Sequence, residues 1–212
     1  MNRRAMAELR TILRRALGPA IAFGLGLATY NFVIVGGGKP TETPPLANAA
    51  IGGEFALQDK TGKTVRFSDF EGKYRVVYFG YTFCPDVCPV DLQNLMQGLN
   101  QLAKTNAEAA AKVQPIFITV DPKRDTPQVV GEFAANFGPK LIGLTGTEEA
   151  IKAAEKSFAV YAEKREGGSA DAYLMDHSRA TYLMGPKGEP LALIPTEQNP
   201  QAVAAELAKW VK

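Results

Sequence analysis

The sequence contains only one histidine, His177, and only two cysteines, Cys84 and Cys88, among 212 residues. A structural zinc site normally takes four protein ligands, so a chain with three soft or borderline ligands argues against such a site. Strong charge of either sign is also missing, because the formal net charge is +2. The sequence has no basic stripe or patch with interleaved aromatic residues, which argues against nucleic-acid binding.

Charge is absent from a second place, residues 16–38 near the N-terminus. As a helix this run would be roughly 34 Å long, enough to cross a bilayer core of about 30 Å. Five arginines precede the run and only Lys39 follows it closely. This asymmetry predicts a single membrane span, with the N-terminus in the cytoplasm and the rest on the periplasmic side. The alternative is a signal peptide cleaved near Ala47-Asn48-Ala49, although the run is long for one.

These features divide the chain into four expected parts. Residues 1–15 form a basic cytoplasmic N-terminus, and residues 16–38 form a transmembrane anchor. Residues 39–50 are rich in proline, threonine and alanine, which is typical of an extended linker. Residues 51–212 form the folded domain, and with 46% hydrophobic residues the chain can bury a proper core.

The order of expected elements in the domain predicts an α/β fold. Apolar runs at residues 76–79 and 113–120 are typical of buried strands, and a helical segment follows each of them. Hairpins are expected around the turns at residues 59–62 and 185–188, and a mobile hairpin or loop at residues 161–175. A strand pair, a βαβα unit, a second strand pair and a final helix predict a central mixed sheet flanked by helices.

Both cysteines lie in the turn between the first buried strand and its helix, where α/β sheets place their chemistry. Pro89 fits best as the first helical residue, which would make Cys88 the N-cap; the alternative places the cap at Cys84. In either frame the sulfurs lie near a helix N-terminus, where the dipole favours thiolate. The pair can close a disulfide or open to bind one soft ion.

Two cysteines and one histidine together suit a three-coordinate copper site. Cu(I) prefers thiolates, and imidazole also suits copper. His177 leads into an expected strand, and a sheet of this order could bring the start of that strand near the cysteine turn. Two other interpretations stay open, a structural disulfide in an exported protein and an ordinary surface histidine.

Three segments, in order, resemble the Sco/SenC family. They are Phe79–Pro89, Asp121–Thr126 and Asp176–His177. The resemblance covers roughly residues 51–212. It implies a membrane-anchored, thioredoxin-like protein that serves the assembly of cytochrome c oxidase.

The resemblance also implies a ligand set and a partner. It implies copper, as Cu(I) and Cu(II), bound by Cys84, Cys88 and His177. It further implies that the protein delivers copper to, or reduces, the binuclear copper site of oxidase subunit II. Many members carry a histidine directly before the first cysteine, where this chain has Phe83. That difference leaves His177 as the only imidazole.

Three aspartates are further candidates for a supporting or partner-binding role. Asp86 lies within the cysteine turn, and Asp121 ends a strand beside the expected site. Asp176 precedes His177 and could orient its ring. Each of the three could instead shape a turn or remain a solvated charge.

Two other functions stay open beside copper delivery. A thiol–disulfide oxidoreductase could reduce the cysteines of the oxidase subunit before copper arrives. A redox or copper sensor could signal to a membrane partner. Other copper chaperones or thiol reductants are expected as further partners. His177 discriminates between the first two functions, because a dithiol reductase does not need it and a three-coordinate copper site does.

Overall fold

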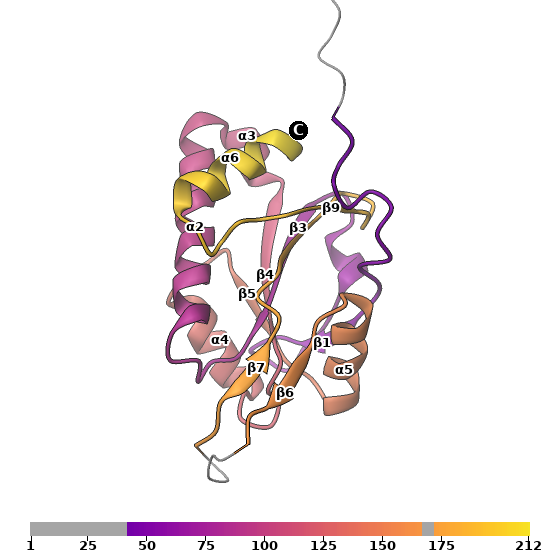
Figure 1. Cartoon of the computed structure of the whole chain (residues 1–212), viewed down its shortest axis with the longest axis vertical. Coiled ribbons are helices and arrows are strands. Elements are labelled where there is room, and N and C mark those ends of the chain that lie inside the picture. The colour runs from indigo at the N-terminus through magenta and orange to yellow at the C-terminus, as the bar shows by residue number, and fades with distance from the viewer. Residues whose placement is uncertain (1–41, 167–171) are drawn as a thin grey trace, which may run out of the picture. The chain divides into compact units, whose positions relative to one another are not determined.

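The computed structural model describes residues 42–166 and 172–212, and Pro44–Lys212 form one compact unit. Its central strands are β3 Tyr74–Gly80, β4 Val113–Thr119, β5 Ile142–Leu144, β8 Thr181–Met184 and β9 Pro190–Leu193. They form one sheet of order β5-β4-β3-β8-β9. Strands β3, β4, β5 and β9 of this sheet are labelled in Figure 1. Strands β3, β4 and β5 run parallel, and β8 and β9 are antiparallel additions. Every residue of β3 and β4 is buried, which explains the apolar runs at residues 76–79 and 115–118 within them.

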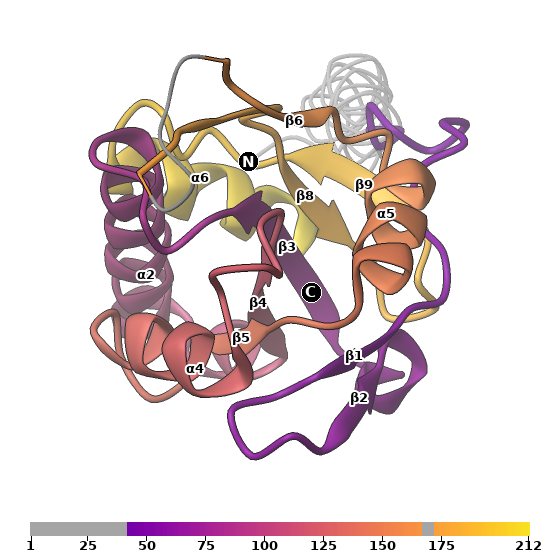
Figure 2. The same ribbon diagram turned by 90° about the horizontal axis from the view of Figure 1, so that it is seen from below.

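Helices cover both faces of this sheet (Figure 2). They are α2 Val87–Thr105, α3 Ala107–Ala111, α4 Pro127–Ala135, α5 Glu148–Ser157 and α6 Pro200–Trp210. On one face, the ring centroids of Phe117 in β4 and Phe133 in α4 lie 5.1 Å apart. On the other face, the ring centroids of Phe79 in β3 and Phe158, directly after α5, lie 5.4 Å apart. The expected mixed sheet with helices on both faces is therefore confirmed.

Two small antiparallel sheets lie outside the central one. The first pairs β1 Ala56–Gln58 with β2 Thr64–Arg66, and η2 Phe67–Phe70 follows it. The Asp59 carboxylate closes this hairpin by accepting hydrogen bonds from the amides of Thr61 and Lys63. The second sheet pairs β6 Ala162–Lys164 with β7 Met175–His177, in the region where a hairpin or loop was expected.

The helical segment after the cysteine turn consists of two helices. The first, α2, ends at Thr105. Asn106 interrupts it, and its side chain accepts a hydrogen bond of 3.0 Å from the amide of Ala109 at the start of α3. Asparagine is a preferred N-cap, which explains why a new helix begins there.

The expected membrane anchor lies outside the described residues, as does the basic segment before it. Within residues 42–166 and 172–212, no helix combines the length and the apolar character that crossing a membrane requires. The expected linker at residues 39–50 is described in part. Leu46 packs against the core, and its amide donates to the Leu191 carbonyl at 3.0 Å. The compact unit therefore begins at Pro44.

Candidate metal centre

The two cysteines lie where β3 passes into α2. Cys84 precedes the helix and is half-buried, whereas Cys88 is the second helical residue and is fully buried. The N-cap is Asp86, so the expected cap at Cys88 is wrong. Pro89 is the third helical residue instead of the first. This position costs no hydrogen bond, because the first amides of a helix have no intrahelical acceptor.

The sulfur of Cys84 serves as an acceptor for the free end of α2. The Asp86 side chain makes no capping hydrogen bond. Instead, the amide of Cys88 donates to Sγ of Cys84 at 3.4 Å. An amide donor at a helix N-terminus stabilises negative charge on the sulfur. The helix therefore favours thiolate at Cys84, as the sequence predicts.

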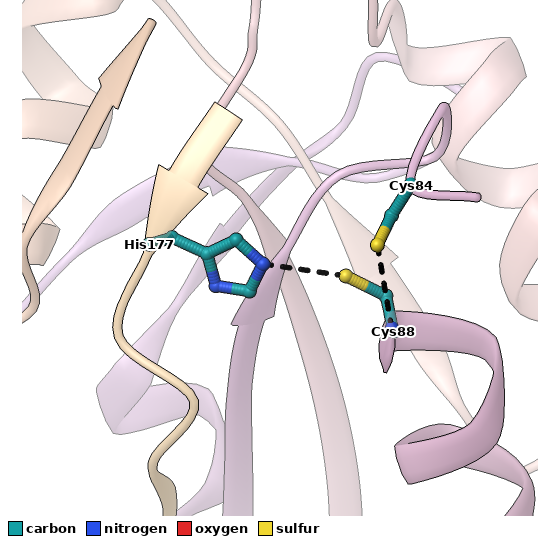
Figure 3. Close-up of side chains that lie close together, drawn as sticks. All are labelled: Cys84, Cys88 and His177. Atoms are coloured by element: carbon teal, nitrogen blue, oxygen red, sulfur yellow. Dashed lines mark hydrogen bonds between the residues drawn. The ribbon is translucent and has the colours of Figure 1, made fainter. Parts of the chain in front are cut away.

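Strand β7 brings His177 to these sulfurs, although His177 lies far along the chain (Figure 3). Nε2 of its ring lies 3.4 Å from Sγ of Cys88. One ligand atom from each of Cys84, Cys88 and His177 lies within 4.8 Å of the others. That separation is about twice a metal–sulfur bond of about 2.3 Å, so one ion could reach all three atoms.

The ring of His177 has a defined tautomer. Its Nδ1 lies 2.9 Å from the carbonyl oxygen of Ser178. A carbonyl oxygen can only accept, so Nδ1 carries the proton and donates it. In the neutral ring, Nε2 then presents its lone pair toward Cys88. This arrangement, with a backbone carbonyl on the far nitrogen, is usual for histidines that bind metals.

The two thiols share their protons unequally. A hydrogen bond from the Cys88 side chain lowers the pKa of Cys84 from its ordinary value of 9.0 to about 3. Burial of Cys84 opposes this lowering. The bond to Cys84, followed by burial, raises the pKa of Cys88. At neutral pH the pair therefore holds one thiolate, Cys84, and one thiol, Cys88.

Asp121 is placed beside the site and not on the metal ligands. Its carboxylate accepts a hydrogen bond of 2.5 Å from Nε of Arg124 and one of 2.8 Å from the hydroxyl of Tyr173. The Arg124 guanidinium also lies 3.6 Å from the centre of the Tyr173 ring and donates to its carbonyl. Asp121 and Arg124 therefore hold the segment that leads into β7.

Asp176 and Asp86 line one cavity together with Cys84 and His177. The Asp176 carboxylate pairs with the exposed Arg165, while the Ser178 carbonyl orients the His177 ring. Asp86 is exposed at the start of α2. Of the six sequence-predicted site residues, the structure brings together Cys84, Cys88 and His177.

Asp125 is a supporting residue that the sequence analysis did not single out. It is fully buried and accepts hydrogen bonds from the amide and hydroxyl of Thr82 and from the hydroxyl of Thr119. It thereby joins the cysteine turn to the end of β4. Burial raises its pKa, and the threonine bonds oppose that effect. Its position in a loop directly after a buried strand was the available signal.

A second missed residue, Asp91, lies one helical turn after Cys88. Its side chain is completely buried and pairs with Arg179 at 2.7 Å. The signal was a charged residue within the apolar face formed by Cys88, Leu92 and Leu95. A carboxylate in such a position normally requires a partner.

The metal centre opens into a shallow cavity of about 310 Å³. Cys84, His177 and Leu174 are among the residues that line it. Phe83, directly before Cys84, leaves 53% of its surface exposed, and Leu174 leaves 37% exposed. The cavity thus gives access to Cys84 and His177, whereas Cys88 is fully buried.

Comparisons with known proteins agree with this arrangement. A sequence model of the SCO1/SenC family matches residues 43–212. The SenC protein of Rhodobacter capsulatus is 46% identical over 158 residues, which cover 74% of this chain and 69% of SenC. The mitochondrial SCO1 homolog 1 of Arabidopsis thaliana is 44% identical over 146 residues, or 69% of this chain. This chain matches only 42% of that relative's length.

Solved structures show the same fold with copper present. Copper-bound ScoI of Bradyrhizobium japonicum superposes with a TM-score of 0.67 at 39% identity, covering 76% of this chain and 99% of ScoI. Copper-bound ScoI of Arabidopsis thaliana gives 0.68 at 38% identity, covering 75% and 97%. The fold is therefore the expected thioredoxin-like α/β fold. The family model, the relatives and these structures agree, and the chain belongs to the SCO1/SenC family.

Proposed function

We propose that this protein binds copper through Cys84, Cys88 and His177 and hands it on during the assembly of cytochrome c oxidase. The observation that carries the proposal is the gathering of these three ligand atoms within 4.8 Å of one another. The copper-bound ScoI structures from two organisms support copper as the ion.

The ligands suit both oxidation states of copper. Two sulfurs serve Cu(I), which is soft, whereas Cu(II) favours nitrogen and oxygen donors. The bond from Nδ1 of His177 to the Ser178 carbonyl leaves Nε2 free to bind either ion. Because Cys84 is already a thiolate at neutral pH, only Cys88 must release a proton when copper binds.

The shallow setting of the site supports transfer to another protein. Copper at the three ligands remains reachable from the cavity, so a partner could supply its own donors before these ligands release the ion. Exposed Phe83 and Leu174 could pack against that partner and exclude water. The partner we propose is subunit II of cytochrome c oxidase, at its binuclear copper site.

Reduction of a disulfide in the same subunit is a second candidate function. The Cys84 thiolate would attack one sulfur of that disulfide and release the other as a thiolate. Cys88 would then lose its proton, attack Cys84 and release the partner's second sulfur. The partner gains two electrons, and this chain keeps a Cys84–Cys88 disulfide. The low pKa of Cys84 and its partial exposure favour this function.

For location, we propose a single-pass membrane protein anchored by residues 16–38, with its domain on the periplasmic side. The charge asymmetry around the apolar run supports this orientation. A reporter that is active only in the cytoplasm, fused after Lys212, should stay silent. Strong cytoplasmic reporter activity would overturn the proposed topology.

Copper titration of the reduced and oxidised protein tests the main proposal. The reduced chain should take up one Cu(I), because both sulfurs are available. The chain oxidised to the Cys84–Cys88 disulfide should take up none. A Cys88→Ser variant, which keeps the size of the side chain, should lose binding under reducing conditions. Equal uptake by the oxidised chain or by Cys88→Ser would place the copper ligands elsewhere.

A further inference from the structure

The strand that carries His177 does not belong to the central sheet. Among the described residues, β7 pairs with β6 alone, in a separate two-stranded sheet. All three residues of β7 are half-buried, whereas every residue of β3 is buried. The ladder of the central sheet therefore does not fix the imidazole beside the cysteines. The imidazole packs edge-on against the ring of Tyr81, with 5.9 Å between ring centroids. Side-chain bonds from the segment that follows β7 to the helix that carries Cys88 add a second constraint.

One ion pair makes this connection directly. Nε and Nη2 of Arg179 donate to Oδ2 and Oδ1 of Asp91, each at 2.7 Å. The Asp91 side chain is completely buried, and the hydroxyl of Tyr78 in β3 donates to its Oδ2 at 3.1 Å. A bidentate arginine–carboxylate pair fixes orientation as well as distance. The buried carboxylate is thus a fixed anchor for the arginine.

The pair lies close to the metal ligands on both sides. Arg179 follows His177 by two residues, and Asp91 follows Cys88 by one turn of α2. We propose that the Asp91–Arg179 pair is a positioning device that holds Nε2 of His177 beside Sγ of Cys88 and thereby lets the site bind Cu(II). This inference rests on the proposed copper function and adds two residues to it.

The effect should depend on the oxidation state of copper. Two thiolates can hold Cu(I) without help, and both sulfurs lie on the β3–α2 side of the site. Cu(II) needs the nitrogen donor, which lies on the β7 side. A second tie, from Asp121 and Arg124 to Tyr173, holds the start of β7. Loss of the Asp91–Arg179 pair should therefore weaken Cu(II) binding without abolishing it.

The chain contains a matched control pair. Arg165 and Asp176 also form an ion pair, and Asp176 is the neighbour of His177. This pair is exposed, with 55% and 48% of the side chains accessible. Both members belong to the β6–β7 hairpin region, so the pair does not connect the hairpin to α2. Its loss removes one arginine beside the histidine without loosening the proposed anchor.

The test compares Arg179→Gln with Arg165→Gln in the full chain. Both copper oxidation states are titrated, and the sulfur-to-copper charge-transfer absorbance of the Cu(II) form is recorded. Arg179→Gln should lower Cu(II) affinity by less than the roughly 10- to 100-fold that loss of a direct hydrogen-bond partner of a metal ligand costs, and should change the absorbance. Its Cu(I) affinity should change far less. Arg165→Gln should resemble wild type in all three measurements.

Two further variants separate positioning from general damage to the fold. Arg179→Lys keeps the charge but loses the two-pronged contact, so its Cu(II) affinity should fall between wild type and Arg179→Gln. Asp91→Asn keeps the shape but weakens the ion pair, and should repeat the selective Cu(II) loss. In metal-free Arg179→Gln, amide hydrogen exchange over residues 175–180 should be faster, while exchange over α2 should match wild type.

Three results would overturn the inference. They are an unchanged Cu(II) spectrum in Arg179→Gln, an equal loss of Cu(I) and Cu(II) affinity, and an equal effect of Arg165→Gln. Wild type and His177→Ala are run in parallel. If wild type binds no copper, or binds it without the three ligands, the proposed function fails. If wild type binds copper through them and Arg179→Gln binds Cu(II) with the same affinity, only the positioning inference fails.

Discussion

The cysteine half of the metal centre lies on firmly packed elements, whereas the histidine half lies on a half-buried strand outside the central sheet. All seven residues of β3 are buried, and the nineteen-residue helix α2 packs its apolar face on the sheet. The buried Asp125 then ties the cysteine turn to β4 through Thr82 and Thr119. In contrast, β7 has three half-buried residues, and contacts of Arg124 and Arg179 tie the segments directly before and after it.

This difference parallels the needs of the two copper ions. The cysteine half supplies the two sulfurs, which suffice to bind Cu(I). The histidine half supplies the nitrogen that Cu(II) needs in addition. A site divided in this way could change its affinity for one oxidation state without rebuilding its sulfur ligands. The comparison therefore predicts different consequences for changes in each half.

The largest selective effect should come from His177→Ala. Cu(II) affinity should fall by more than the roughly 10- to 100-fold expected for an outer-shell partner, because a ligand itself is lost. Cu(I) should still bind through the two sulfurs, with a smaller loss. Titration of both ions, with the sulfur-to-copper absorbance of the Cu(II) form, measures the split.

The cysteine pair provides the internal control for His177→Ala. Its disulfide should form and be reduced as in wild type, because both sulfurs are untouched. An unchanged Cu(II) spectrum and affinity would remove the histidine from the site. That result would favour thiol–disulfide exchange by the two cysteines as the function. It would also contradict the assignment of the Cu(II) nitrogen ligand to the histidine half.

The second effect is a loss of stability and of Cu(I) affinity in the cysteine half, caused by Gly80→Ala. A Cβ at Gly80 would lie 2.9 Å from Sγ of Cys88, 2.9 Å from Cε1 of Tyr78 and 3.1 Å from Cε2 of Phe117. These neighbours are buried and have little room to move. The free energy of unfolding should fall by about 1–3 kcal/mol, as for overpacked cores. Displacement of the sulfur should also lower Cu(I) affinity.

Urea unfolding of the metal-free chain and Cu(I) competition titration measure the two effects of Gly80→Ala. Hydrogen exchange over residues 175–180 serves as the control and should not change, because the new methyl group touches only the cysteine half. Unchanged Cu(I) affinity would show that the N-terminus of α2 can shift to accommodate the methyl group. The cysteine half would then not be more firmly held than the histidine half.

The strands and the helix of the cysteine half were also easier to predict from the sequence than the histidine half. Continuous apolar runs and a following periodic segment predict β3, β4 and α2 because burial dictates residue type. The cap was predicted wrongly, because Pro89 was assigned to the first helical position although the third is equally free of hydrogen-bond cost. Local sequence patterns therefore predicted the two strands and the helix, but not the residue at which the helix begins.

The support of the histidine half could not be predicted in the same way. Arg179 and Asp91 lie far apart in the chain, and no local pattern reveals which charge will meet which. The sequence suggested Asp176 as the neighbour that orients His177, because adjacency was the only available information. The fold turns that carboxylate toward Arg165 and gives its role to the Ser178 carbonyl.

A third effect is a dependence of the stability on pH, which comes from the cysteine half. The pKa of Cys84 is lowered in the fold from 9.0 to about 3, first by the hydrogen bond from Cys88. A lowered pKa means that the thiolate stabilises the folded state. This contribution is complete above the ordinary thiol value and is lost gradually as the pH falls towards about 3.

Cys84→Ser removes this ionisation and serves as the reference. The difference in unfolding free energy between wild type and Cys84→Ser should grow in favour of wild type from about pH 4 to about pH 8. Urea unfolding of the reduced, metal-free proteins at several pH values measures the slope. A difference that does not vary with pH would mean that Cys84 keeps an ordinary thiol, and the helix N-terminus would then give no thiolate.

The smallest effect should come from Asp176→Asn, where the adjacency in sequence and the contacts in the structure predict opposite results. If Asp176 oriented His177, the variant would lose Cu(II) affinity as an outer-shell variant does. Its carboxylate instead pairs with Arg165, and both side chains are about half exposed. Exposed ion pairs contribute little, and the Ser178 carbonyl still fixes the ring, so Cu(II) affinity and spectrum should stay near wild type. A loss matching that of Arg179→Gln would return Asp176 to the site and would show that the hairpin's own charges, and not its anchor on α2, hold the histidine half in place.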